Sequence, residues 1–149
     1  MNNGYTNITA TAFSKEALNI INKSNPSLHT NDTWYNCSFS IKDNEINIII
    51  ADLCLHYFNK EKTKSILKEI NRVLKTNDYL IGRVNSVKDI NYIPNGTMLE
   101  DNFYFDGKVY KKFYNYDDLK ELFKDFKIIS LEEKVMTRYE NQKHYLSSA

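Results

Sequence analysis

The strongest pattern in the chain is an apolar and largely β-branched run over residues 46–51, interrupted only by Asn47. A run with so little polar alternation is typical of a strand in a parallel sheet that is buried on both faces. A second run of this kind covers residues 79–84. Between the two runs, apolar residues recur with helical spacing at Ile66, Leu67, Ile70, Val73 and Leu74. The pattern therefore predicts a strand, a helix and a second strand of one parallel sheet.

Capping residues and turn formers predict further elements around this unit. Before the first run we expect a strand over residues 5–12, a helix that begins after Ser14, and a weak strand within residues 27–34. Asn59 is expected to cap the helix between the two runs. Residues 76–78 are expected to form a turn, because Asn and Asp bond their own backbone and tolerate turn dihedrals.

After residue 84 the pattern becomes less regular. The aromatic-rich residues 85–114 are expected to be irregular. Asn115 and Asp118 are expected to open a helix, and strands are expected over residues 126–131 and 142–146. Helices that alternate with strands along the whole chain favour an α/β fold.

Composition and charge exclude several classes of protein. The 149 residues fit one domain, and 20 basic against 19 acidic residues provide no strong attraction to nucleic acid or to a membrane surface. No apolar run is long enough to span a bilayer, so we expect a cytoplasmic location. Cys37 and Cys54 have no metal-type spacing and are too few for a disulfide framework. No metal site is expected.

Two segments carry a resemblance to a known family. Residues 46–58 read Ile-Asn-Ile-Ile-Ile-Ala-Asp-Leu-Cys-Leu-His-Tyr-Phe, and residues 72–86 supply a helix end, a turn and a buried strand. Together they resemble the middle of a class I S-adenosylmethionine-dependent methyltransferase, of the small tellurite-resistance-like and type 11 and 12 group. The resemblance implies a Rossmann-like sheet with strand order 3-2-1-4-5-7-6, S-adenosylmethionine as cofactor, and an unidentified methyl acceptor.

The chain departs from this family at its N-terminal side. The family's first strand leads into a loop resembling Asp-x-Gly-x-Gly, whereas the four glycines here, at positions 4, 82, 96 and 107, have no such spacing. We therefore expect a single partial domain over residues 1–149 that lacks the family's first strand, first helix and glycine-rich loop. Residues 46–149 are its expected core block, and residues 1–45 are less secure. Three arrangements then remain open: the family's second strand pairs directly with its fourth, another chain fills the gap through the exposed strand edges and makes a homo-oligomer, or roughly the first 40 residues dock loosely.

The resemblance also implies which residues lie beside the cofactor. They come from the ends of three strands: Phe13, Ser14, Asp32, Thr33, Ala51, Asp52 and Leu53. Ala12 stands where the family usually has an acid that binds both ribose hydroxyls, and a methyl group cannot accept those hydrogen bonds. Asp32 and Thr33 have a second interpretation, as part of an Asn-Asp turn.

Substrate contacts and catalysis are expected at the same edge of the sheet. His56 is the candidate base, with structural hydrogen bonding as the alternative. Tyr57, Asn85 and Ser86 are candidate substrate contacts, and Tyr57 is equally a wall or core residue. The aromatic side chains of residues 91–116 either stack a planar substrate or cover the open end of the sheet.

Two functions remain open. The first is methyl transfer to an unknown acceptor, with an incomplete cofactor site in this chain. The second is a non-catalytic pseudo-enzyme that acts as a binding or oligomerisation module. Nucleic-acid and membrane partners are not expected, given the balanced charge.

Overall fold

A computed structural model of the chain describes residues 7–12, 14–31, 38–89, 92, 96–138 and 141–148. The chain divides into two compact units, Met1–Lys42 and Asp43–Ala149. Among the described residues, no helix combines the length and apolarity that a membrane span requires.

The first unit is a small strand–helix–strand motif. It comprises β1 (Thr9–Thr11), α1 (Lys15–Ser24) and β2 (His29–Asn31), and the two strands pair in parallel. Ser14 caps α1, because its hydroxyl accepts a hydrogen bond from the Ala17 amide at 3.2 Å. The three elements confirm the predicted pattern, although both strands are only three residues long.

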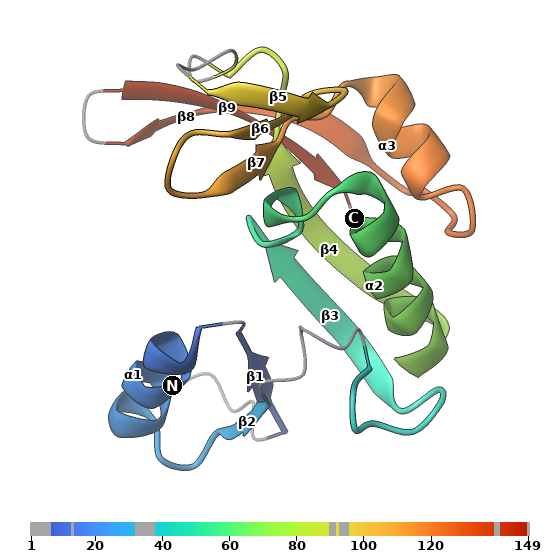
Figure 1. Cartoon of the computed structure of the whole chain (residues 1–149). Helices are drawn as coiled ribbons and strands as arrows, with labels where there is room; N and C mark the ends of the chain where they lie inside the picture. Colours follow the sequence, from blue (N-terminus) through green and yellow to red (C-terminus); the bar gives the residue numbers. More distant parts are fainter. Residues whose placement is uncertain are drawn as a thin grey trace. The chain divides into compact units, whose positions relative to one another are not determined.

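The second unit contains a four-stranded sheet in the order β3-β4-β9-β8 (Figure 1). Its strands are β3 (Ile46–Asp52), β4 (Leu74–Asn85), β8 (Leu131–Arg138) and β9 (Asn141–Ser148). β3 and β4 are parallel, and β9 is antiparallel to both of its neighbours. This is the order 4-5-7-6 that the resemblance implies for the second half of the sheet.

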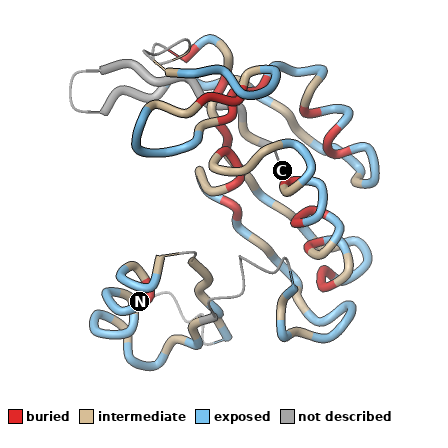
Figure 2. Tube along the Cα trace, viewed as in Figure 1, coloured by how far each residue is buried: buried red, intermediate tan, exposed pale blue. Residues whose placement is uncertain are grey.

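Helix α2 (Lys60–Val73) connects β3 to β4 and covers one face of this pair. Asn59 caps it by accepting from the Lys62 amide at 2.9 Å. Four aliphatic side chains of the helix are almost fully buried: Ile66, Leu67, Ile70 and Val73. Burial of each is worth about 1.5–3 kcal/mol, so this face anchors the helix to the sheet. Figure 2 shows the buried residues along α2 in red.

The other face of the β3–β4 pair differs from the expectation of a strand buried on both sides. Ile48 and Ile50 alternate with the inward-facing positions of β3 and are 55% and 71% exposed. The expectation is wrong for these residues, because α2 covers one face only and no described element of Asp43–Ala149 covers the other.

Residues 85–114 are more regular than the sequence predicted. They contain a three-stranded antiparallel sheet of β5 (Thr97–Glu100), β6 (Phe103–Phe105) and β7 (Tyr110–Lys112). These strands are too short to show a clear alternation, which explains why the pattern missed them. Helix α3 (Tyr116–Leu122) follows, with the predicted Asn115 cap in a reciprocal capping box with Asp118.

Two predicted boundaries are wrong. Residues 76–78 lie within β4 rather than in a separate turn: Asn77 has a φ of 68°, and the pairing of β3 with β4 shifts register between Ile46 and Ile48. A local bulge thus accommodates the turn-forming residues. The strand expected over residues 126–131 starts only at Leu131 and continues to Arg138.

Candidate functional site

The carboxyl ends of β3 and β4 lie side by side, because the strands are parallel and in register. Asp52 is opposite Arg83, and Ala51 is opposite Gly82. Beyond the strand, Leu53 has a φ of 50° and donates its amide to the Arg83 carbonyl oxygen at 3.0 Å. This backbone bond fixes the exit of β3. In open α/β sheets, ligands bind outside such carboxyl ends.

A bidentate ion pair joins the two strand ends. Arg83 Nε lies 2.5 Å from Asp52 Oδ1, and Arg83 Nη2 lies 2.8 Å from Oδ2. The hydrogen bonds from Arg83, together with its charge, lower the pKa of Asp52 below its ordinary value, although partial burial opposes the shift. Both side chains are more than a third exposed, so solvent screening limits the pair to about 1 kcal/mol of stability. Its main effect is to orient Asp52.

Cys54 follows this pair and is half-buried. Burial, and then the nearby Asp52 carboxylate, raise the pKa of its thiol to about 11. The thiol therefore stays protonated at neutral pH, and the thiolate needed for nucleophilic chemistry is scarce. A Cys54–His56 nucleophilic site is not supported.

His56 lies in a short 3-10 helix, η2 (Leu55–Tyr57), between β3 and α2. It is only 5% exposed, and its ring packs against that of Tyr57 with centroids 4.2 Å apart. This burial favours the structural interpretation of His56, because a base must reach the proton that it removes. The catalytic role stays a prediction.

The end of β4 is tied to other elements. The Asn85 carbonyl oxygen accepts from the Tyr114 amide at 2.9 Å. Ser86 is buried; its hydroxyl donates to Glu133 and accepts from the Lys88 amide at 3.0 Å. Ser86 therefore links β4 to β8. Its role as a substrate contact, like that of Asn85, stays a prediction.

The aromatic residues around β5–β7 mostly pack against one another. Tyr92 meets Phe113 at a centroid distance of 5.5 Å and Tyr104 at 6.1 Å, and Phe103 stacks on Tyr110 at 5.6 Å. Phe103, Tyr104 and Phe113 are buried. These contacts favour the interpretation that the aromatics cover the sheet rather than form an open stacking surface.

The structure brings together only some of the predicted site residues. Seven of them share the carboxyl edge of β3 and β4: Ala51, Asp52, Leu53, His56, Tyr57, Asn85 and Ser86. Ser14 belongs to the first unit, where its hydroxyl caps α1 and donates to Glu16 at 3.0 Å. Phe13, Asp32 and Thr33 lie outside the described residues. In the part of the chain that the structure describes, no three metal-ligating side chains gather.

Arg83 is the site residue that the sequence interpretation missed. Arg83 stands within the apolar run of residues 79–84, where a charged residue suggests only that the position faces solvent. The signal was nevertheless present: in a parallel pair, Asp52 at the end of one run and Arg83 near the end of the next fall on the same row of the sheet.

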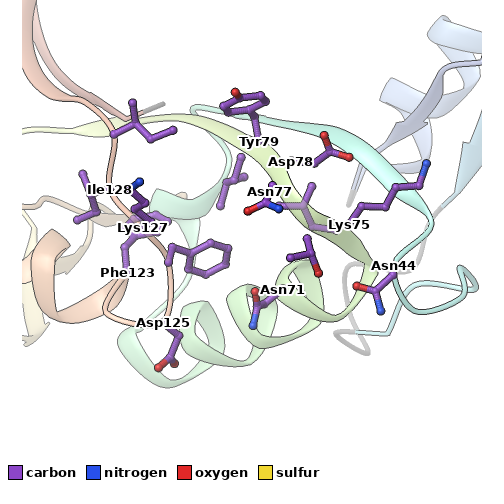
Figure 3. A pocket seen from close by; sticks show the side chains of 15 residues that line it. Asn44, Asn71, Lys75, Asn77, Asp78, Tyr79, Phe123, Asp125, Lys127 and Ile128 are labelled. Carbon is purple, nitrogen blue, oxygen red and sulfur yellow. The ribbon is translucent and has the colours of Figure 1, made fainter.

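A cavity of about 620 Å³ lies at the opposite end of β4 (Figure 3). Its wall comes from the amino end of β4, the end of α2 and the segment after α3, including Asn71, Lys75, Asp78 and Phe123. Residues 74–80 of β4 all contribute. Because ligands of parallel sheets bind at carboxyl ends, we do not assign the candidate site to this cavity.

Comparison with known proteins gives a consistent result for family and fold. A family model described as a methyltransferase domain matches residues 1–82. A SAM-dependent methyltransferase from Methanosarcina mazei has a TM-score of 0.76 at 16% identity, over 95% of this chain and 80% of that chain. A putative S-adenosylmethionine-dependent methyltransferase from Listeria monocytogenes has a TM-score of 0.70 at 15% identity, over 97% and 80%.

A third solved structure contains bound molecules. It is 1,6-didemethyltoxoflavin-N1-methyltransferase from Burkholderia thailandensis, with 1,6-didemethyltoxoflavin and S-adenosylhomocysteine. Its TM-score is 0.66 at 14% identity, over 94% of this chain and 58% of that chain. At these identities the likeness concerns the fold. No curated protein sequence matches the chain.

Proposed function

This chain belongs to the methyltransferase domain family, and from that membership we propose that it serves S-adenosylmethionine-dependent methyl transfer at the carboxyl edge of β3 and β4. The observation that carries the proposal is the convergence of seven predicted site residues at this edge, where parallel sheets bind ligands. At this edge, Tyr57 and Asn85 are the residues proposed to contact the methyl acceptor.

The residues of this chain fit the cofactor only in part. Asp52 places a carboxylate at the end of β3, and Leu53, with its left-handed backbone, turns the chain directly after it. Both Asp52 oxygens, however, already accept hydrogen bonds from Arg83. A cationic ligand group at this position must share the carboxylate with the guanidinium. When bound, the cofactor supplies an electrophilic methyl group; Asp52 and Arg83 would set the charge beside it.

We further propose that the cofactor site of this chain is incomplete. The sequence has no pair of glycines spaced to form a Gly-x-Gly loop, and Ala12 follows β1 where the resemblance implies an acid. Loss of one such hydrogen-bond acceptor costs about 1–3 kcal/mol, or roughly a tenfold to hundredfold loss of affinity. We expect a dissociation constant of about 10 µM or weaker for S-adenosylmethionine.

Isothermal titration calorimetry with S-adenosylmethionine tests this proposal. We expect weak binding that Asp52→Asn reduces further, because the substitution removes one negative charge at the strand end. Asp117→Asn is the matched control, since Asp117 is an exposed carboxylate on α3 in a loose ion pair with Lys120 at 3.8 Å. A dissociation constant in the low micromolar range or below would contradict the incomplete site, and binding that Asp52→Asn leaves unchanged would contradict its location.

The second candidate function is a non-catalytic binding or oligomerisation module. The observation that favours it is the exposed apolar face of β3, with Ile48 and Ile50 accessible to a partner. A non-catalytic module is the alternative to methyl transfer; association through this face alone does not exclude methyl transfer, because the face is a different part of β3 from its carboxyl edge.

A further inference from the structure

Among the described residues of Asp43–Ala149, β3 lies at one edge of the four-stranded sheet. Within the described residues of Asp43–Ala149, β4 is the one strand that pairs with β3. Leu53 donates its amide to Arg83 of β4, so odd-numbered residues of β3 point their backbone groups toward β4. The even-numbered residues, Ile48 and Ile50 among them, point their amides and carbonyls to the free edge. An open edge of this kind is a template for another strand.

The same region carries an exposed apolar patch. Because Ile48 is opposite Tyr79 and Ile50 is opposite Ile81, these four side chains form two adjacent rows on one face of the sheet. All four are exposed although they are large and apolar. A contiguous patch of this type, beside an open edge, marks an interaction surface rather than a solvated face.

The two outer edges of the sheet differ in how they resist pairing. β8, at the opposite edge, carries the exposed charges of Glu132 and Lys134, and charges on an edge strand oppose association. Residues 46–51 of β3 carry no charge and no proline. The charge at the end of the strand, Asp52, is already paired with Arg83. Within the described part of Asp43–Ala149, the sheet thus has charged side chains along its β8 edge and no strand paired to the outer side of β3.

We propose that two copies of this chain pair through β3, as antiparallel strands related by a twofold axis at Ile49. This register pairs the whole of Ile46–Asp52 with its copy, since Ile46 falls opposite Asp52 of the partner. It also brings the outward-pointing residues together, because Ile48 faces the partner's Ile50 and both carry free backbone groups. No two like charges are opposed. The patches of both copies become continuous across the axis.

The pairing has a consequence for the candidate site. The partner's Ile46 lies beside Asp52, and the partner's Glu45 falls opposite Leu53, so the second copy contributes to the wall of the carboxyl edge. The two carboxyl edges point to opposite ends of the combined sheet and both stay open. The inference does not depend on methyl transfer, because it follows from the edge and the patch alone.

Sedimentation velocity of the full chain over a concentration series tests the pairing. We expect a monomer–dimer equilibrium that Ile50→Lys weakens at least tenfold. Val135→Lys on β8 is the matched control, because Val135 is 54% exposed and occupies the other edge. Circular dichroism checks that both variants keep their fold. A monomer at all concentrations, larger assemblies, or dissociation by Val135→Lys instead of Ile50→Lys would overturn the proposal.

Disulfide formation tests the register. At the twofold axis Ile49 faces its copy in a non-hydrogen-bonded pair, with Cα atoms about 4.5 Å apart. This distance lies within the roughly 4.4–6.8 Å that a disulfide spans. In a background with Cys37→Ser and Cys54→Ser, Ile49→Cys should form a cross-linked dimer without reductant. Ile50→Cys should not, because its copy lies diagonally at about 7–8 Å. Cross-linking of Ile50→Cys alone would refute the register.

Amide hydrogen exchange tests whether a segment of the same chain covers the outer edge of β3. We expect the amides of Ile48 and Ile50 to exchange more slowly as the protein concentration rises, since pairing protects them. Slow exchange in a dilute monomer would show that a segment of the same chain covers the edge, and this result also overturns the proposal.

Discussion

Truncation of the Ile70 side chain measures how much the buried face of α2 contributes to the free energy of unfolding. Ile70 is 1% exposed and belongs to the buried face of α2, in the last turn of the helix. Ile70→Ala deletes three carbon atoms, which at about 0.8 kcal/mol each amounts to about 2.4 kcal/mol of lost burial. The cavity left in the packed interface adds to this, so we expect a loss of about 3–4 kcal/mol in the free energy of unfolding.

Urea unfolding followed by circular dichroism measures this loss. With a denaturant dependence of about 2 kcal/mol per molar, the midpoint should fall by about 1.5–2 M. Ile129→Ala is the matched control, because the same side chain is 62% exposed there. The control should change the unfolding free energy by about 0.5 kcal/mol or less. If the two variants lose the same stability, α2 is not the anchor that its burial indicates.

Three further outcomes follow from the site. Asn59→Ala should destabilise α2 by about 1 kcal/mol through loss of its cap, measurable by urea unfolding. The lowered pKa of Asp52 provides stability at neutral pH that is lost as the pH falls through its folded-state pKa; Asp52→Asn should therefore show a shallower stability loss below about pH 4, and an unchanged acid profile would refute the Arg83 pairing. In a Cys37→Ser chain, Cys54 should react slowly with iodoacetamide at pH 8 and faster toward pH 11; rapid alkylation at pH 8 would contradict its burial.

The local elements of the fold could be predicted because their signals are short-range. Ser14, Asn59 and Asn115 each cap a helix as expected, since a cap depends on a side chain and an amide three residues away. The buried face of α2 was also predictable, because its apolar residues recur with helical spacing from Ile66 to Val73. The strand order of the second unit came from the family resemblance rather than from periodicity.

Features that depend on contacts between distant residues could not be predicted from the sequence. The run at residues 46–51 looks the same whether one face of its strand is covered or two, so the exposure of Ile48 and Ile50 depends on what packs on the sheet. The Asp52–Arg83 pair depends on the strand register across 31 positions of sequence. The strands β5, β6 and β7 are held by pairing with one another, and no single one has a distinctive pattern.

The location of the methyl-transfer site is tested most directly by an NMR titration with S-adenosylhomocysteine. Backbone amide shifts report where a ligand binds even when the affinity is weak. We predict that the largest changes fall on Ala51, Asp52 and Leu53, with smaller changes at Asn85. Changes confined to Lys75 and the other residues around the cavity at the amino end of β4 would contradict the assignment of the site to the carboxyl edge.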